Sequence, residues 1–187
     1  MFASPHLIVI GGFAGSGKST LAKKLGHHFS IPVFEIDELA HTIKTSNDFH
    51  GESREAYGIA FDLFFAFARR HLQQGSSLIL DQNMGHALTW ENVRIVRDTV
   101  PTVAVNIFLL DCPYDLCVTR VATRTAHPNL TEVTPAHLDD HKYKWEYVRT
   151  HAWPDAIRID ATRDPETVFQ AVLNNLQPPF TSPGEPA

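Results

Sequence analysis

Short apolar runs alternate along the chain with longer segments of helical periodicity. The runs are rich in β-branched residues, as buried strands are, and each is separated from the next by enough residues for a crossover helix. The five expected strands are Leu7–Ile10, Val33–Ile36, Ser77–Leu80, Val103–Leu110 and Ala156–Ile159. This alternation predicts a doubly wound α/β fold of three layers, α/β/α, with a five-stranded, mainly parallel sheet covered on both faces.

A stripe of apolar residues predicts a long helix between Ser53 and Gln74, and Gly75 stands where that helix would end. The spacing of three and four residues places the stripe on one helix face, and we expect that face in the core. Its members are Phe61, Phe64, Phe65, Ala68 and Leu72.

Two later helices, expected over Thr134–His151 and Asp164–Leu176, each begin with a cap residue followed by proline. Residues 177–187 are rich in proline and offer little to bury, so we expect a flexible tail there. The chain is therefore expected to form one domain over residues 1–176, followed by a short tail.

Composition narrows the class of protein. The chain has 187 residues, 43% hydrophobic and 20% charged, and a net charge of -5, which gives no broad electrostatic footprint for nucleic acid or an anionic membrane. No apolar run approaches the ~20 residues that cross a bilayer, and no basic stretch precedes the first one, so we expect a cytoplasmic protein. Cys112 and Cys117 are too few for a disulfide framework, and we interpret them as reduced packing residues.

The segment from Gly12 to Ser19 satisfies the pattern G-x-x-x-x-G-K-[ST] of a phosphate-binding loop, or Walker A motif, between a strand and a helix. Its backbone N–H groups would surround nucleotide phosphates. Lys18 would reach the β- and γ-phosphates, and the Ser19 hydroxyl would ligate Mg²⁺. The expected nucleotide-binding residues are Gly12, Phe13, Ala14, Gly15, Ser16, Gly17, Lys18, Ser19 and Thr20. No guanine-reading Asn-Lys-x-Asp pattern occurs, which favours ATP over GTP.

Two aspartates follow predicted strands and should lie at the same sheet edge as the phosphate-binding loop. Asp37 could accept the proton of an acceptor hydroxyl. Asp81 could hold Mg²⁺ through water, bind the acceptor or serve as the base itself. Each could instead be only a helix cap, while Glu35 and Glu38 are less well placed.

Arg120 and Arg124 are four residues apart on one face of an expected helix. Arginines on a lid commonly stabilise the charge that phosphoryl transfer spreads over the γ-phosphate, and residues 125–133 would form the lid tip. The alternative is a solvated helix face. His137 and His141 have the spacing of metal ligands, but no third ligand is evident and we expect no zinc.

Together these segments resemble the small P-loop kinases around phage polynucleotide kinase, chloramphenicol phosphotransferase and the zeta-toxin-like kinases, which have an AAA-type ATP-binding domain. The resemblance covers about residues 6–176. It lies in four segments, which are Gly12–Thr20, Phe34–Asp37, Leu78–Asn83 and Leu109–Arg124. It implies a nucleoside-kinase-like fold with a small helical lid, a base at Asp37, acceptor-side or metal-side roles for Asp81 and Asn83, and a lid arginine at Arg124.

The chain departs from the polynucleotide branch directly after Asp37. That branch is expected to carry a basic residue there to read the acceptor's phosphate, whereas this chain has Glu38-Leu39-Ala40. We therefore predict transfer of the ATP γ-phosphate, with Mg²⁺, to a hydroxyl of a small molecule. A 5′-hydroxyl polynucleotide kinase and a non-catalytic ATP-binding regulatory module remain as alternatives.

Overall fold

The computed structural model describes residues 4–123, 134–151 and 155–176, and it is built around one parallel sheet. The strands follow the order β2-β3-β1-β4-β5, and every pairing between neighbours is parallel. They are β1 (His6–Gly12), β2 (Val33–Glu35), β3 (Leu78–Gln82), β4 (Ala104–Asp111) and β5 (Ala156–Asp160). The predicted five-stranded α/β fold is confirmed.

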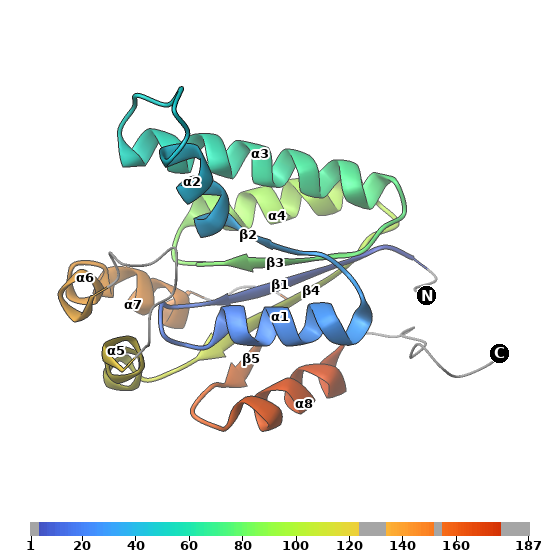
Figure 1. Cartoon of the computed structure of the whole chain (residues 1–187). Helices are drawn as coiled ribbons and strands as arrows, with labels where there is room; N and C mark the ends of the chain where they lie inside the picture. Colours follow the sequence, from blue (N-terminus) through green and yellow to red (C-terminus); the bar gives the residue numbers. More distant parts are fainter. Residues whose placement is uncertain (1–3, 124–133, 152–154, 177–187) are drawn as a thin grey trace.

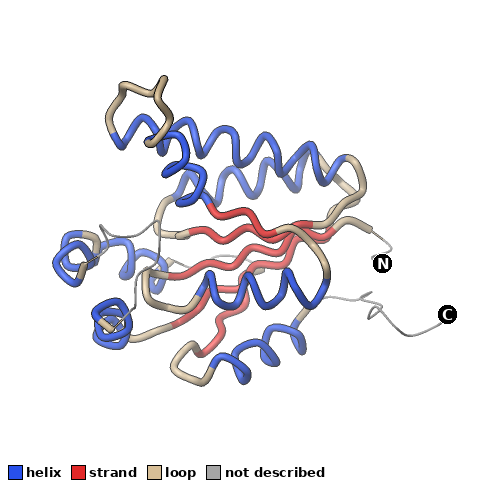
Figure 2. Tube along the Cα trace, in the orientation of Figure 1, coloured by secondary structure: helices blue, strands red, loops and turns tan. Residues whose placement is uncertain are grey.

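Helices cover both faces of this sheet. They are α1 (Lys18–Phe29), α2 (Ile36–Lys44), α3 (Ser53–Gln73), α4 (Ala87–Thr99), α5 (Tyr114–Ala122), α6 (Pro135–Asp140), α7 (Lys142–Thr150) and α8 (Pro165–Asn175). Figures 1 and 2 show α3 and α4 on one face, α1 and α8 on the other, and α5, α6 and α7 at the end toward which the strands run. None of these helices is long and apolar enough to cross a membrane.

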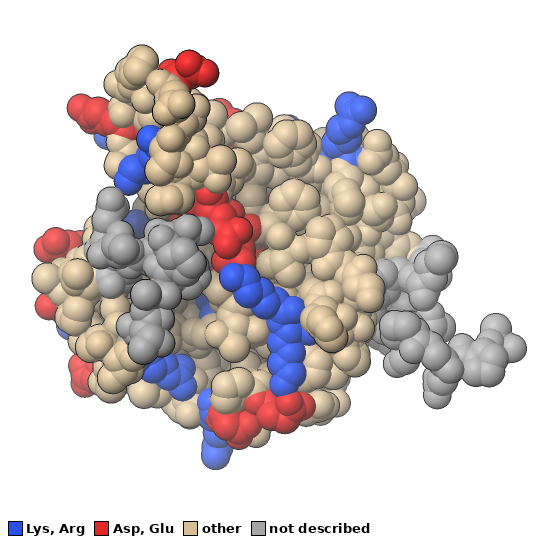
Figure 3. Space-filling view, viewed as in Figure 1, with Lys and Arg blue, Asp and Glu red and all other residues tan. Residues whose placement is uncertain are grey.

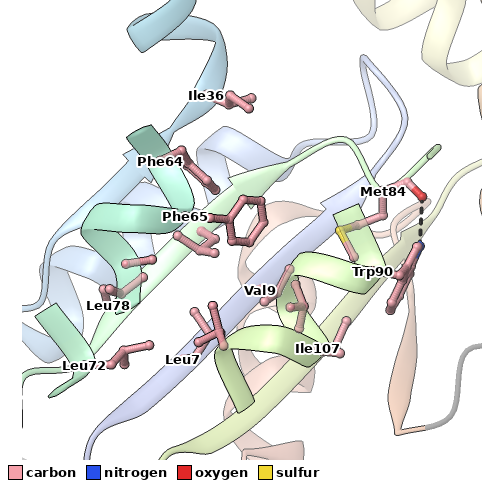
Figure 4. Close-up of a cluster of buried hydrophobic side chains, with 14 of the residues drawn as sticks. Leu7, Val9, Ile36, Phe64, Phe65, Leu72, Leu78, Met84, Trp90 and Ile107 are labelled. Carbon is pink, nitrogen blue, oxygen red and sulfur yellow. Dashed lines mark hydrogen bonds between the residues drawn. The ribbon is translucent and has the colours of Figure 1, made fainter. Parts of the chain in front are cut away.

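One apolar cluster fills the space between the sheet and the α3–α4 layer (Figure 4). Phe64, Phe65, Ala68 and Leu72 of the predicted stripe are each at most 2% exposed, so the expectation of a core role holds for them. Phe61 is only partly buried and also lines a cavity described below. Burial of such apolar area is the main favourable contribution to folding.

Trp90 closes this cluster near the carboxyl ends of the strands. Its Nε1 donates a hydrogen bond of 3.1 Å to the carbonyl oxygen of Met84 (Figure 4). Met84 is itself fully buried in the cluster. Because Met84 lies between Asn83 and Gly85, this bond holds the loop after β3 against α4, and that loop forms part of the candidate site.

The opposite face is packed by α1, α5 and α8. Cys112 and Cys117 are buried in this second cluster and carry free thiols, as predicted. The predicted caps are also observed, because the Thr134 side chain accepts a hydrogen bond from the amide of His137 and Asp164 caps α8 in the same way.

The single helix expected over residues 134–151 is wrong, since the chain breaks at His141 into α6 and α7. The imidazole Nδ1 of His141 lies 2.9 Å from the carbonyl oxygen of His137, the group that the His141 amide would bind in a continuous α-helix. That amide bonds to the carbonyl of Leu138 instead. The side chain thus competes for a backbone acceptor and turns the chain.

Candidate active site

The phosphate-binding loop connects β1 to α1 at the carboxyl edge of the sheet, where the sequence places it. Three of its glycines, Gly12, Gly15 and Gly17, adopt backbone conformations that L side chains rarely adopt. Gly15 has φ of 84° and lies so close to α5 that an added Cβ would be 2.5 Å from the carbonyl oxygen of Cys117. Gly17 has φ of 98° and precedes α1, whose first N–H groups therefore face the loop's concave side without intrahelical partners.

Lys18 extends from the first turn of α1 back across the loop. Its Nζ donates a hydrogen bond of 3.2 Å to the carbonyl oxygen of Phe13. This contact holds the ammonium beside the space that the loop encloses, which is where phosphates would lie.

Asp81 is buried next to this loop, inside β3 and opposite Ile10 of β1. Burial raises the pKa of the carboxyl group, while the charge of Lys18 and a hydrogen bond from the Ser19 hydroxyl oppose that rise. A residue within a strand cannot cap a helix, so the cap interpretation of Asp81 is wrong. The Ser19 hydroxyl and the Asp81 carboxylate are hard oxygen donors, a set that fits Mg²⁺ together with nucleotide phosphates and water.

Asp37 lies in the first turn of α2, which begins at Ile36 directly after β2, so the predicted strand is one residue too long. The N-cap position of α2 belongs to Glu35, and Asp37 is therefore not a cap. The Asp37 carboxylate accepts a hydrogen bond of 3.3 Å from the Tyr57 hydroxyl of α3. Its side chain is exposed to a cavity that it shares with Lys18.

This cavity has a volume of about 830 Å³ and lies between α2 and α3 on one side and α6 and α7 on the other. The loop after β1 and the residues at the end of β3 also line it. Its lining comprises Phe13, Ala14, Lys18, Ile36, Asp37, Arg54, Tyr57, Gly58, Phe61, Asp62, Gln82, Asn83, His86, Leu88, Thr89, His137, Leu138, His141, Tyr143 and Lys144.

Gln82 is a cavity residue that the sequence analysis missed. It is 6% exposed, and its Nε2 donates a hydrogen bond of 3.4 Å to the Thr89 hydroxyl. Its Oε1 is buried and has no hydrogen-bond partner among the described residues. A buried acceptor without a hydrogen bond costs free energy. This oxygen is therefore suited to accept a hydrogen bond from a hydroxyl group of a ligand. A glutamine that directly follows Asp81 at the end of a buried strand was the signal that could have identified it.

Asn83, predicted to bind substrate, does line the cavity. Its Oδ1 accepts a hydrogen bond of 2.9 Å from the amide of Gly85, which orients the side chain. The neighbouring Lys144 of α7 was not predicted. It reaches the cavity because α7 packs directly on Gly85, where an added Cβ would be 2.7 Å from the Cβ of Lys144.

Glu35 has a structural partner rather than a place in the cavity lining. Its carboxylate forms a 3.0 Å ion pair with Lys23 of α1, and this hydrogen bond raises the pKa of the lysine. Glu38 lies 4.0 Å from the same ammonium and is half exposed. The sequence analysis judged both glutamates less well placed than Asp37 and Asp81, and neither is among the residues that line the cavity.

Arg120 is on α5, and its Nη1 lies 3.6 Å from the Sγ of Cys112. Contact with the Cys117 thiol and, more weakly, the charge of Arg120 lower the pKa of Cys112 to about 7. Arg120 is not part of the cavity lining, so its predicted contact with the γ-phosphate remains a prediction. Arg124 and the predicted lid tip at 125–133 lie outside the described residues.

His137 and His141 both line the cavity, with their rings stacked at a centroid distance of 4.2 Å. In the described ranges no group of three His, Cys, Asp or Glu side chains is placed to hold a metal ion. The two stacked rings form part of the cavity wall.

Several solved structures share this fold. A protein of Chloroflexus aurantiacus assigned as a kinase superposes with a TM-score of 0.69 at 22% identity, covering 93% of this chain and 100% of that one. A sugar kinase from Janibacter sp. HTCC2649 gives 0.65 at 19% identity, covering 91% and 93%. A gluconokinase from Sinorhizobium meliloti 1021 gives 0.61 at 17% identity, covering 91% and 90%. The fold is therefore that of P-loop kinases.

No curated protein matches the chain at the level of sequence. The sequence model of the AAA domain family matches residues 8–151, which is more than half of the chain. The chain belongs to this family, and the resemblance to small P-loop kinases is confirmed.

Proposed function

We propose that this AAA-domain protein is an ATP-dependent kinase that transfers the γ-phosphate to a hydroxyl group of a small molecule. The observation that carries the proposal is that Lys18 of the phosphate-binding loop and Asp37 of α2 line one cavity. A donor phosphate and an acceptor hydroxyl can therefore meet in the same enclosed space. The cavity's volume of about 830 Å³ is in the range of small-molecule sites.

In the proposed reaction the acceptor oxygen forms a bond to the γ-phosphorus, and the bond from that phosphorus to the β,γ-bridging oxygen breaks. The acceptor proton moves to the carboxylate of Asp37, and ADP leaves. Lys18 and the loop amides stabilise the charge on the transferred group, and Asp37 orients the nucleophile. Mg²⁺ held by Ser19 and Asp81 would neutralise phosphate charge.

A small acceptor is supported over a nucleic acid. Among the described residues, the Arg and Lys side chains that line the cavity are Lys18, Arg54 and Lys144. These three do not form the long basic groove that follows a nucleic-acid backbone. Figure 3 shows acidic and basic groups intermingled on the face drawn there, and the net charge is -5. The sugar kinase and gluconokinase among the structural neighbours favour a hydroxylated small acceptor.

The test is to incubate the protein with ATP and Mg²⁺ and a panel of small hydroxyl compounds, with one 5′-hydroxyl oligonucleotide included. Mass spectrometry should show a mass gain of one phosphoryl group on a small compound. Lys18→Ala should abolish it, whereas Lys24→Ala should not, because Lys24 lies on the same helix but pairs with Glu166 at the surface.

Preferential phosphorylation of the oligonucleotide would replace the proposal with a polynucleotide kinase. ATP binding without any acceptor-dependent turnover across the panel would favour the regulatory module instead.

A further inference from the structure

We propose that the acceptor carries an anionic group, a carboxylate or a phosphate, which Arg54 and Lys144 bind while its hydroxyl faces Asp37. This inference rests on the proposed function, because it names the class of acceptor for the same cavity. It is carried by two cations from opposite walls that have no ion-pair partner in the described part of the chain.

Lys144 forms the wall contributed by α7. Lys144 is only partly exposed, and the close approach of α7 to Gly85 fixes the position of its Cβ. Burial lowers the pKa of its ammonium, and the charge of Asp37 only partly opposes this effect. A cation that has lost water without gaining a salt bridge is stabilised when an anion arrives.

Arg54 forms the opposite wall, on the first turn of α3. The cavity-lining residues of this helix are Arg54, Tyr57, Gly58, Phe61 and Asp62, spaced as one helical face. An added Cβ at Gly58 would meet no atom within 4 Å, so this face leaves room beside Arg54. A guanidinium in such a place suits two-point binding of a carboxylate or phosphate.

The described charged side chains of the cavity that are not assigned to ATP or to the acceptor hydroxyl have a net positive charge, which favours binding of this anion. Lys18 is assigned to ATP phosphates and Asp37 to the acceptor hydroxyl, which leaves Arg54 and Lys144 against Asp62. His86 adds a donor near Lys144. Burial, followed by the charges of Lys144 and His141, lowers the pKa of His86, so this ring favours its neutral form until an anion binds.

Gln82 indicates independently that the acceptor substrate carries a hydroxyl group besides its anionic group. Its buried Oε1 needs a donor, and a carboxylate or phosphate group carries none at neutral pH. A hydroxyl group on the same ligand would provide that donor. The cavity therefore fits a hydroxylated anion better than a purely anionic or a purely neutral compound.

The experiment compares matched acceptors, with an aldonic acid against its alditol for the carboxylate and a sugar phosphate against the free sugar for the phosphate. In the wild type kcat/KM should favour one anionic member over its neutral partner by at least tenfold. Lys144→Gln should raise KM for that anion about 10- to 100-fold, which is the effect expected when a hydrogen bond to a charged group is lost. Lys142→Gln is the matched control, because Lys142 stacks over the Tyr114 ring outside the cavity.

If Lys144→Gln alters folding, Arg54→Gln tests the second wall. Arg70→Gln, at an exposed position near the C-terminal end of α3, is its control. Phosphorylation with no preference for anions, or an equal preference in Lys144→Gln and the wild type, would overturn the inference and leave the proposed function standing.

Binding is measured in parallel by thermal shift with ADP and each anion. An anion that stabilises the wild type but neither cavity variant, without being phosphorylated, would support the anion site and contradict the kinase proposal. Absence of both binding and phosphorylation for every anion would overturn the inference.

Discussion

The hydroxyl of Tyr57 donates a hydrogen bond of 3.3 Å to the carboxylate of Asp37, joining α3 to α2 in the lining of the cavity. The two residues are separated by 20 positions in the chain, and the contact restricts where the carboxylate can point. We expect this bond to position the base for the acceptor hydroxyl.

Tyr57→Phe removes the hydrogen bond and keeps the ring. Because this bond is long and exposed, we expect it to contribute about 0.5–1.5 kcal/mol although its acceptor is charged, so kcat should fall about 2- to 10-fold. The KM for ATP should not change, because the hydroxyl that is removed donates to Asp37 on the acceptor side. Steady-state kinetics with both substrates varied would check this, and an unchanged kcat would show that the contact does not position Asp37.

Gln82→Met tests the buried acceptor oxygen. Methionine keeps the length of the side chain but offers the ligand hydroxyl only a weak partner, so KM for the acceptor should rise about 2- to 10-fold. The melting temperature should change little, because the Oε1 that is removed has no partner in the described structure and the Nε2 bond to Thr89 that is also lost is long, at 3.4 Å. Gln74→Met, at an exposed position after α3, is the control.

Asp81→Asn should have opposite effects on stability and activity. Burial makes the pKa of this carboxyl higher in the folded protein than in the unfolded chain. Protonation of Asp81 therefore favours the folded state, and this contribution is complete at pH values below the unfolded pKa. That contribution is lost as pH rises through the folded pKa. At pH 7 the ionised form therefore carries a desolvation penalty, which asparagine does not have.

The ligand-free variant should consequently melt higher than the wild type at pH 7, by about 2–4 °C for each kcal/mol gained, and the gap should narrow toward pH 4. Mg²⁺-dependent turnover should be largely lost, because an amide is a weaker ligand than a carboxylate. A lower melting temperature at pH 7 would contradict the assignment of Asp81 as a functional group held at a cost in stability.

Residues tied to short motifs or strand ends were predictable from the sequence. The loop from Gly12 to Thr20 is recognised by its sequence motif. Asp37 and Asp81 lie at the same edge of the sheet because parallel strands end there. The structure adds that neither aspartate caps a helix, which required the observed start of α2 and the observed end of β3.

Residues brought to the cavity by packing were not predictable in the same way. Lys144 reaches it because α7 lies on Gly85, a contact between segments about 60 residues apart whose only local sign is a small residue. The break between α6 and α7 depends on an imidazole that takes a backbone acceptor. Periodicity and end signals carry no information about that competition. The tail at 177–187 lies outside the described residues and remains a prediction.

The rate of phosphoryl transfer in Asp37→Asn tests the proposed function most directly. A positioned base contributes about 10²- to 10⁴-fold, so acceptor-dependent kcat should fall by that factor while ATP affinity and melting temperature stay near wild type. Glu38→Gln, one position away and half exposed, should retain activity. Near-normal kcat in Asp37→Asn would contradict the assignment and move the base to Asp81.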